Sequence, residues 1–232
     1  LDAGVDKLRI NPGHIGGRRR AALVARAAAE RGVPIRVGVN AGSLEKGLLE
    51  KHGGPTPAAM VESALGQARI LEEEGLRDVV VSIKSSRVTD AVEAYRMMAE
   101  ASDYPLHLGI TEAGTAWSGA IRSAVGLGVL LWEGIGDTVR VSLTADPVEE
   151  VRAAYEILGA LGLRRRGAQV ISCPTCGRAE VDIAPVAAEL ERRAAGLDVP
   201  LRIAVMGCVV NGPGEARDAD EGLAAGRGVA LL

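Results

Sequence analysis

Short apolar runs alternate with stretches of helical spacing along the first two thirds of the chain. Runs rich in Val, Ile and Leu predict buried strands at residues 5–10, 35–39, 79–83, 106–110 and 138–143. Between and after them, helical spacing predicts helices at 18–31, 57–75, 89–101, 117–132 and 147–161. Pro57 and Pro147 stand where the first turn of a helix tolerates proline. Nearly continuous apolar strands that alternate with helices predict a parallel sheet in an α/β fold.

The pattern changes near "LRRRGAQV", residues 163–170. A strand is expected at 168–171, a helix at about 182–195 and a strand at 201–206, followed by the Gly- and Pro-rich "GCVVNGPGE". We therefore predict a domain boundary near residue 165, with a barrel-type domain over 1–165 and a small α/β domain over 166–232. The repeat of roughly 25–40 residues in the first domain suits a barrel or an open doubly wound sheet.

Charge and composition exclude several classes of protein. The formal net charge of -3 gives no general attraction to nucleic acid or to an anionic membrane. No apolar run reaches the ~20 residues that span a bilayer, and no signal peptide opens the sequence. Three cysteines, an odd number without an export signal, favour reduced functional thiols in a cytosol over a disulfide framework. Because the chain lacks an initiator Met and opens like the end of a helix, we expect a fragment.

Polar residues follow the predicted strands at one end. The five runs end in "LRINPG", "VGVNAGS", "VSIKSS", "LGITEAG" and "RVSLTADP". The carboxyl ends of parallel strands meet at one edge, where α/β barrels place their active sites, so these residues predict one functional face. Any single one can be a helix cap or a chance occurrence, but five successive strand ends each carry a potential ligand. The face consists of Arg9, Asn11, Asn40, Lys84, Glu112, Arg140 and Ser142.

The basic residues of this face indicate the kind of ligand. Guanidinium groups and loop amides bind phosphate oxygens well, so Arg and Lys beside Asn and Gly-rich turns favour an anionic ligand. His107 lies between two leucines and is interpreted as a satisfied histidine of the barrel interior rather than as a metal ligand. Trp117 and Trp132 share one helical pattern and are interpreted as packing residues.

A second group of candidate ligands lies in "ISCPTCGR", residues 171–178. Cys173 and Cys176 have a spacing that can hold zinc or an iron–sulfur cluster. A closed structural zinc site usually has four cysteines, or three cysteines and a histidine, as ligands. Here Cys208 is the third and last cysteine, and no histidine follows residue 107, so a fourth ligand of either kind is missing. The first carboxylate after Cys208 is Glu215, and three thiolates with an oxygen donor suit a cluster that has one non-cysteine iron. Zinc and plain thiols remain open alternatives, while the CxxxCxxC pattern of radical-initiating clusters is absent.

Six longer motifs, in sequence order, resemble one enzyme family. They are "LRINPGHIG", "IRVGVNAGSLE", "PLHLGITEAG", "GIGDTVRVSLTADP", "CPTCGR" and "GCVVNGPGEA", and they cover essentially the whole chain. Together they are similar to the 4-hydroxy-3-methylbut-2-enyl diphosphate synthases, bacterial enzymes of the methylerythritol phosphate route to isoprenoids. The resemblance implies a cytoplasmic enzyme that opens and reductively dehydrates 2-C-methyl-D-erythritol 2,4-cyclodiphosphate, consuming two electrons and losing water.

The resemblance also implies a cofactor, site residues and partners. A 4Fe-4S cluster would be held by Cys173, Cys176, Cys208 and Glu215, and the carboxylate would be the exchangeable ligand. The positions that match diphosphate ligands of the family are Arg9, Arg36, Asn40 and Lys84. Glu112 matches a carboxylate that donates a proton, which agrees with the need for an acid when hydroxide leaves carbon. Electrons would come singly from ferredoxin or flavodoxin, and the cluster domain of one chain would close over the barrel of its partner in a homodimer.

One departure from the family pattern limits what this chain is expected to do alone. The family barrel has eight βα units, whereas the pattern here predicts about five, a partial (β/α)8 TIM-type barrel followed by a small α/β iron–sulfur domain. We expect an unclosed sheet with apolar edges, which favours aggregation and leaves the chain alone inactive. Two other functions stay open: a zinc-knuckle binding module on an α/β scaffold, and a non-redox barrel enzyme for a phosphorylated substrate.

Overall fold

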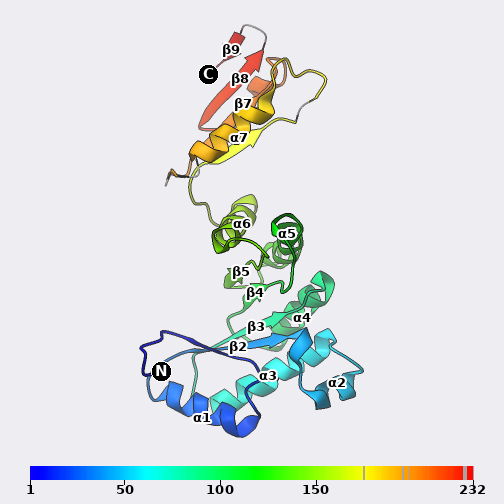
Figure 1. Cartoon of the computed structure of the whole chain (residues 1–232), viewed down its shortest axis with the longest axis vertical. Coiled ribbons are helices and arrows are strands. Elements are labelled where there is room, and N and C mark those ends of the chain that lie inside the picture. The colour runs from blue at the N-terminus through cyan, green and yellow to red at the C-terminus, as the bar shows by residue number, and fades with distance from the viewer. Residues whose placement is uncertain (175, 195, 198, 227–228, 232) are drawn as a thin grey trace. The chain divides into compact units, whose positions relative to one another are not determined.

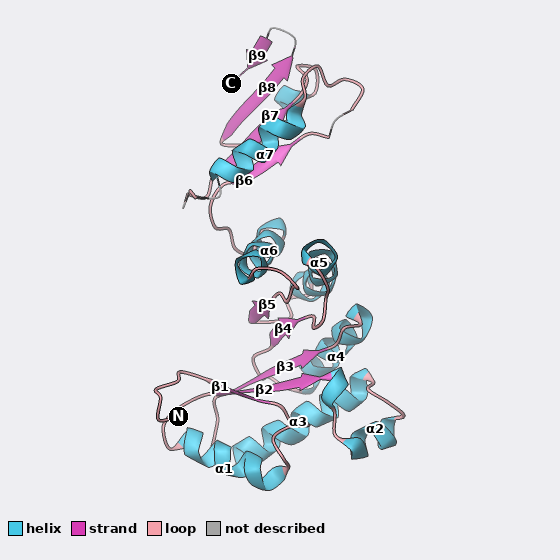
Figure 2. Cartoon of the chain, viewed as in Figure 1, coloured by secondary structure: helices cyan, strands magenta, loops and turns pink. Residues whose placement is uncertain are grey.

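The computed structural model describes residues 1–174, 176–194, 196–197, 199–226 and 229–231. The chain divides into two compact units, Leu1–Leu161 and Gly162–Leu232, and the boundary expected near residue 165 stands shortly beyond this division. Strands and helices alternate along both units (Figures 1 and 2). Each unit has its own cluster of buried apolar side chains and is described by itself below.

The N-terminal unit contains five strands, each followed by a helix. In chain order its elements are β1 (Leu8–Ile10), α1 (Arg18–Ala29), β2 (Ile35–Asn40), the 3-10 turn Ala41–Ser43, α2 (Lys46–His52), α3 (Pro57–Glu73), β3 (Val79–Lys84), α4 (Val88–Ala101), β4 (His107–Gly109), α5 (Ala116–Trp132), β5 (Thr138–Arg140) and α6 (Pro147–Ala160). Pro57 and Pro147 stand in the first turns of α3 and α6, as predicted. The residues before them are N-caps: Thr56 accepts a hydrogen bond from the amide of Ala59, and Asp146 accepts one from the amide of Val148.

All strand pairs in this unit are parallel. Strands β1, β2 and β3 form one sheet, and β4 and β5 form another. In register, Arg9 lies beside Arg36, and Asn40 beside Lys84. Since side chains alternate between the two faces of a strand, one face carries the aliphatic residues that pack under the helices, among them Val37, with none of its surface exposed. The polar residues fall on the other face.

Tyr95 joins the two sheets where β3 meets β4. A single parallel bridge, Val81 to Leu106, connects these strands. The fully buried phenol of Tyr95 donates a hydrogen bond to the carbonyl of His107 at 2.7 Å and accepts one from the amide of Ile83 at 3.1 Å. The α/β class with parallel strands is thus confirmed, but the described residues of this unit form two small sheets and no closed barrel.

The C-terminal unit is a four-stranded sheet with helices on opposite faces. Its elements are β6 (Gln169–Ser172), α7 (Ile183–Ala194), β7 (Arg202–Met206), α8 (Gly212–Glu215), β8 (Glu221–Gly226) and β9 (Val229–Leu231). Strands β6, β7 and β8 are parallel and β9 pairs antiparallel at the edge. One face buries Val205 against Ile183 of α7, and the other buries Met206 and Ala224 near α8.

The sequence-predicted strands and helices are confirmed, with ends that differ by a few residues. Residue 195, the predicted end of the helix at 182–195, lies outside the described residues. The patterning missed α2, α8, β8 and β9. Three of them are short, and β8 is rich in Gly and Ala, which have weak intrinsic β-propensity, so its pairing with β7 decides its conformation. The interpretation of Trp117 and Trp132 as packing residues is wrong, because they are 80% and 81% exposed.

Candidate active site and cluster site

Four basic side chains share the polar face of the N-terminal strands. Arg9 and Arg36 lie beside each other on β1 and β2, and Arg140 ends β5 in register with Gly109. Lys84, at the end of β3, is only 8% exposed. Among the described residues none of the four has a carboxylate partner at ion-pair distance. The face is therefore a cluster of cations without an internal counter-ion.

The pKa values of Lys84 and Arg36 are lowered by burial and by repulsion from the neighbouring cations. Burial, followed by the charges of Arg140, Arg36 and Arg9, lowers the pKa of Lys84 to about 8, and the charge of Glu150 opposes this as the smallest effect. Burial, with Arg9 and Arg140, also lowers the pKa of Arg36. Both shifts mean that the charged forms are disfavoured until an anion binds, which is typical of functional sites.

Two strand glycines make room for the cations, and the sequence analysis missed them. A Cβ on Gly38 would lie 2.5 Å from Nε of Arg9, whose Nη2 donates to the Gly38 carbonyl at 3.2 Å. A Cβ on Gly109 would lie 2.9 Å from Cε and 3.0 Å from Nζ of Lys84. The signal was present, since glycine inside a strand marks a close approach of another group.

Replacing Gly109 by alanine should displace the Lys84 side chain and weaken binding of an anionic ligand several-fold. The added methyl group would also lie 3.0 Å from the backbone oxygen of Arg140, so it cannot avoid Lys84 by shifting toward β5. Isothermal titration with inorganic pyrophosphate, a simple anionic probe, measures the effect. Gly66→Ala is the matched control, because an added Cβ there has no atom within 4 Å; equal losses in both variants would contradict the packing argument.

Glu112 adopts a strained backbone conformation after β4. Its φ of 51° makes it the one non-glycine residue at positive φ in the described part of the chain. Such a conformation costs of the order of 1–3 kcal/mol and clusters at active sites. Its side chain is exposed, so the carboxylate is free to approach a ligand.

The other predicted face residues differ in their partners. Asn11 is 7% exposed and both ends of its amide are engaged: Oδ1 accepts from the amide of Gly13, and Nδ2 donates to Ser43 Oγ, each at 2.9 Å. Asn40 and Ser142 are half-buried. Asn11 therefore holds the loop after β1, whereas Asn40 lies in register with Lys84 on the cation face.

His107 is not fully satisfied. Its Nδ1 lies 2.8 Å from Thr138 Oγ1, but its buried Nε2 has no partner. Burial and then the charges of Arg36, Lys84 and Arg140 lower its pKa to about 3, so the ring is neutral at physiological pH. A neutral imidazole among cations adds a hydrogen-bonding group to this face without adding charge.

The predicted cluster ligands line one cavity in the C-terminal unit. Cys173 follows β6 and Cys208 follows β7, and since these strands are parallel neighbours, both thiols stand at the same edge of the sheet. Cys176 comes from the loop after β6, and Glu215 ends α8. A cavity of about 330 Å³ lies among all four, within the size range of small-ligand sites.

Backbone amides favour thiolates at this cavity. The amide of Gly207 donates to Cys173 Sγ at 3.2 Å. Backbone hydrogen bonds from Asn211, Val210 and Gly212 lower the pKa of Cys208. Amide hydrogen bonds to sulfur ligands are also among the features that set the potential of iron–sulfur clusters. Neither amide group was identified from the sequence, because such contacts depend on how the loops fold.

The donor set is compatible with a four-iron cluster. Its four potential ligands lie around a common cavity. In a four-iron cluster each protein ligand binds a different iron, so the ligands surround a cage rather than one point. Three thiols and one carboxylate around a common cavity match that arrangement.

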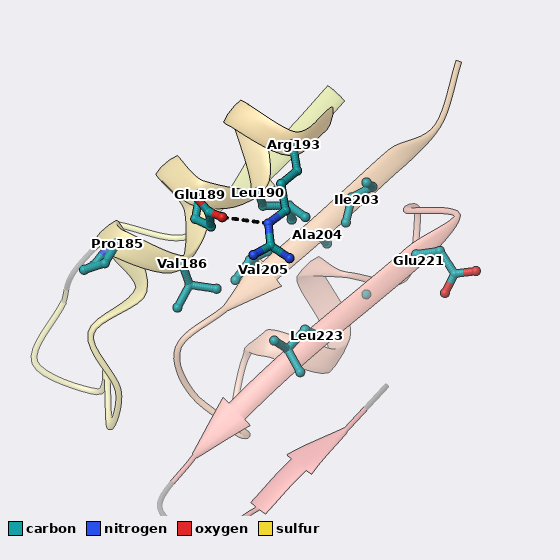
Figure 3. Close-up of a pocket in the computed structure, with 11 residues that line it drawn as sticks. Pro185, Val186, Glu189, Leu190, Arg193, Ile203, Ala204, Val205, Glu221 and Leu223 are labelled. Atoms are coloured by element: carbon teal, nitrogen blue, oxygen red, sulfur yellow. Dashed lines mark hydrogen bonds and ion pairs between the residues drawn. The ribbon is translucent and has the colours of Figure 1, made fainter. Parts of the chain in front are cut away.

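A second hollow in the C-terminal unit has different chemistry. It has a volume of about 560 Å³ and lies between α7 and strands β7 and β8 (Figure 3). Aliphatic side chains line it, among them Leu190, Ile203 and Leu223, and Arg193 at its rim pairs with Glu189. Because it contains no thiol, it is not a candidate redox site. Among the described residues, every helix is too short or too polar to cross a membrane.

Comparisons with known proteins match both units. Residues 1–155 match the GcpE TIM-barrel domain and residues 169–232 match the GcpE protein C-terminal domain. The chain is 62% identical over its whole length to a protein named 4-hydroxy-3-methylbut-2-en-1-yl diphosphate synthase (flavodoxin) from Symbiobacterium thermophilum, and spans 63% of that relative. Proteins of the same name from Geobacter sulfurreducens and Clostridium tetani are 62% and 54% identical over all 232 residues, and the chain spans 66% of each. It thus spans slightly less than two thirds of these relatives.

Proposed function

This chain belongs to the GcpE family, and on that premise we propose that it carries the active-site residues of a 4-hydroxy-3-methylbut-2-enyl diphosphate synthase. The reaction opens the ring of 2-C-methyl-D-erythritol 2,4-cyclodiphosphate, consumes two electrons and two protons, and releases water. The observation that carries the proposal is the gathering of three thiols and a carboxylate around one cavity. That donor set suits an electron-transferring cluster, and it lacks the four cysteines, or three cysteines and a histidine, of the usual structural zinc site.

The cation cluster would bind the diphosphate. Arg9, Arg36 and Arg140 offer planar donor groups that match phosphate oxygens bidentately, and Lys84 adds a point charge. An anionic ligand would remove the repulsion that lowers the pKa of Lys84 and Arg36. Asn40, in register with Lys84, and Ser142 would add uncharged hydrogen bonds. These groups orient the ring and hold it in place.

Glu112 is the proposed proton donor. The loss of the hydroxyl group from carbon needs an acid within hydrogen-bonding reach. Glu112 follows β4 at the same edge at which Lys84 ends β3 and Arg140 ends β5. Its strained backbone fixes the direction in which the carboxyl leaves the loop.

Cys173, Cys176, Cys208 and Glu215 would hold a 4Fe-4S cluster. When bound there, the cluster supplies the two electrons, one at a time. The amides of Gly207, Val210, Asn211 and Gly212 stabilise negative charge on the sulfur ligands. A carboxylate oxygen is the weakest ligand of the set, so Glu215 is the group that would give way to an incoming oxygen of the substrate.

The proposed partners follow from the same family assignment. The names of the relatives specify flavodoxin as their electron donor, and we propose flavodoxin or ferredoxin for this protein. We further propose a cytoplasmic homodimer in which the cluster unit of one chain closes over the strand-end face of the other.

The test is the metal and sulfide content of the chain, with an optical spectrum, after strictly anaerobic reconstitution. About four irons and four sulfides per chain, with a brown chromophore that bleaches on reduction, are expected. One zinc per chain and no sulfide would reject the cluster in favour of a zinc-binding module. Retained activity of the full-length protein without any metal would favour a non-redox enzyme and also reject it.

Binding of the cyclic diphosphate should weaken above pH 8. Lys84 has a pKa of about 8 without ligand, and a bound anion raises that pKa. By linkage, affinity is constant below this value and falls by up to about tenfold per pH unit above it. Arginine stays charged throughout this range. Titration calorimetry of the full-length protein from pH 7 to 10 measures the slope, and Lys84→Met should abolish it; an unchanged slope in that variant would contradict the role of Lys84.

A further inference from the structure

The strained conformation of Glu112 has to be maintained by contacts outside the residue itself. A non-glycine residue keeps a φ of 51° only where the surrounding structure over-determines its backbone. On the N-terminal side, the amide of Thr111 donates to the carbonyl of Ser85 at 3.3 Å, so the segment that follows Lys84 holds this end of the loop. The residues that follow Glu112 must be held by other elements.

Helix α5 holds the loop that follows Glu112. The guanidinium of Arg122 donates from Nη1 to the carbonyl of Ala113 at 2.9 Å. Ala113 is only 1% exposed, so this carbonyl is shielded from water and needs a donor from the protein. One turn earlier on α5, Oγ of Ser118 lies 2.8 Å from the position that a Cβ on Gly114 would take. The loop therefore packs directly on the first two turns of the helix.

The contact made by Arg122 differs in kind from the others in this loop. The amide of Thr144 donates to the carbonyl of Gly114 at 2.8 Å, and the methyl group of Ala113 packs beside Ile110. Arg122 instead contributes a charged donor, and a charge-assisted hydrogen bond is roughly twice as strong as a neutral one. Among the described residues it has no carboxylate partner at ion-pair distance. Its guanidinium is therefore directed to the loop rather than to a surface ion pair.

From these contacts we propose that Arg122 is a positioning residue, which fixes the loop so that the carboxyl group of Glu112 stays where it can protonate the ligand. The inference rests on the proposed role of Glu112 as proton donor. Arg122 acts through the carbonyl of Ala113 and does not touch the reacting atoms. Without it, the peptide groups after Glu112 are free to rotate, and the carboxyl group moves. A displacement of about 1 Å can cost on the order of 10²-fold in rate.

Replacing Arg122 by methionine removes the donor and keeps a long side chain with good helix propensity. In the full-length protein, kcat should fall at least tenfold, while binding of the cyclic diphosphate and iron content stay close to those of the parent. Arg122→Lys should recover most of the turnover, since an ammonium group can donate to the same carbonyl. Hydrogen exchange, followed by mass spectrometry, should be faster in Arg122→Met for peptides that cover residues 111–115.

A double-mutant cycle with Glu112→Gln separates positioning from general stabilisation. A residue that acts through Glu112 has nothing to position once the acid is removed, so Arg122→Met should cost no further turnover in the Glu112→Gln background. Arg96→Met serves as the control. Arg96 is an exposed residue of α4 that donates from Nε to Glu133, at the other end of α5, at 2.8 Å. This variant should keep the turnover and the exchange of the parent.

The outcomes distinguish a failure of this inference from a failure of the proposed function. Unchanged kcat in Arg122→Met would overturn the role of Arg122, as would an equal fold-loss in the parent and Glu112→Gln backgrounds. Unchanged exchange at residues 111–115 in Arg122→Met would show that Arg122 does not hold the loop, and Glu112 would remain the acid if Glu112→Gln is slow. Parent turnover in Glu112→Gln would reject the acid itself, and this inference with it.

Discussion

Replacing Cys208 by serine should leave the full-length protein without a complete 4Fe-4S cluster after anaerobic reconstitution. Cys208 is the most buried of the three thiols and its thiolate form is favoured by three backbone amides. A serine hydroxyl stays protonated at neutral pH and is a poor ligand for iron, so those amides would face a neutral oxygen. Turnover should fall by more than about a hundredfold, beyond the loss typical of an outer-shell partner.

Iron and sulfide analysis and the optical spectrum measure this effect directly, independently of activity. Val210→Ser is the control, since Val210 is 72% exposed in the same loop and its amide, which points to Cys208, is kept. The control should assemble the parent's cluster. Full iron content and full turnover in Cys208→Ser would remove this residue from the ligand set and with it the assignment of the cavity.

Much of this architecture could be predicted from the sequence, because most strands are continuous apolar runs, the helices are spaced as amphipathic segments, and two of them begin at a proline. The predicted Pro57 and Pro147 helix starts agree with the structure, as does the parallel pairing of β1 to β3. The order of motifs also placed the chain in its family. Side chains alternate between the two faces of a strand, and the register pairs Arg9 with Arg36 and Asn40 with Lys84. Arg9, Arg36 and Lys84 therefore lie on one face of the sheet.

What the sequence did not provide depends on contacts between distant segments. Gly38 and Gly109 reveal their role only when the side chains of Arg9 and Lys84 are seen to occupy the space above them. The exposure of Trp117 and Trp132 could not be read from helical periodicity, which gives the angle between residues and not the side that faces solvent. Likewise, Tyr95 joins β3 to β4 through hydrogen bonds to the backbone of both, a role that no local pattern indicates.

Replacing Glu112 by glutamine should reduce turnover of the full-length protein by about 10²–10⁴-fold, the usual contribution of a general acid. Glutamine has the same shape but no proton of suitable acidity. Binding of the cyclic diphosphate should stay within a few-fold of the parent, because the cation cluster is intact, and iron content should not change. Steady-state kinetics with a chemical reductant, together with titration calorimetry, separate these quantities.

Two further variants distinguish an acid from a merely structural residue. Glu100→Gln changes an exposed glutamate near the end of α4, which precedes β4 at the opposite edge of the sheet, and should be fully active. Glu112→Gly should be as inactive as Glu112→Gln without a lower Tm, because glycine adopts a φ of 51° at no steric cost. A Tm that falls in Glu112→Gly, or turnover that persists in Glu112→Gln, would mean that the side chain supports the loop rather than the chemistry. If instead both variants lose turnover and Glu112→Gly keeps its Tm, the strained backbone is explained by the need for a carboxyl group at this place in the site.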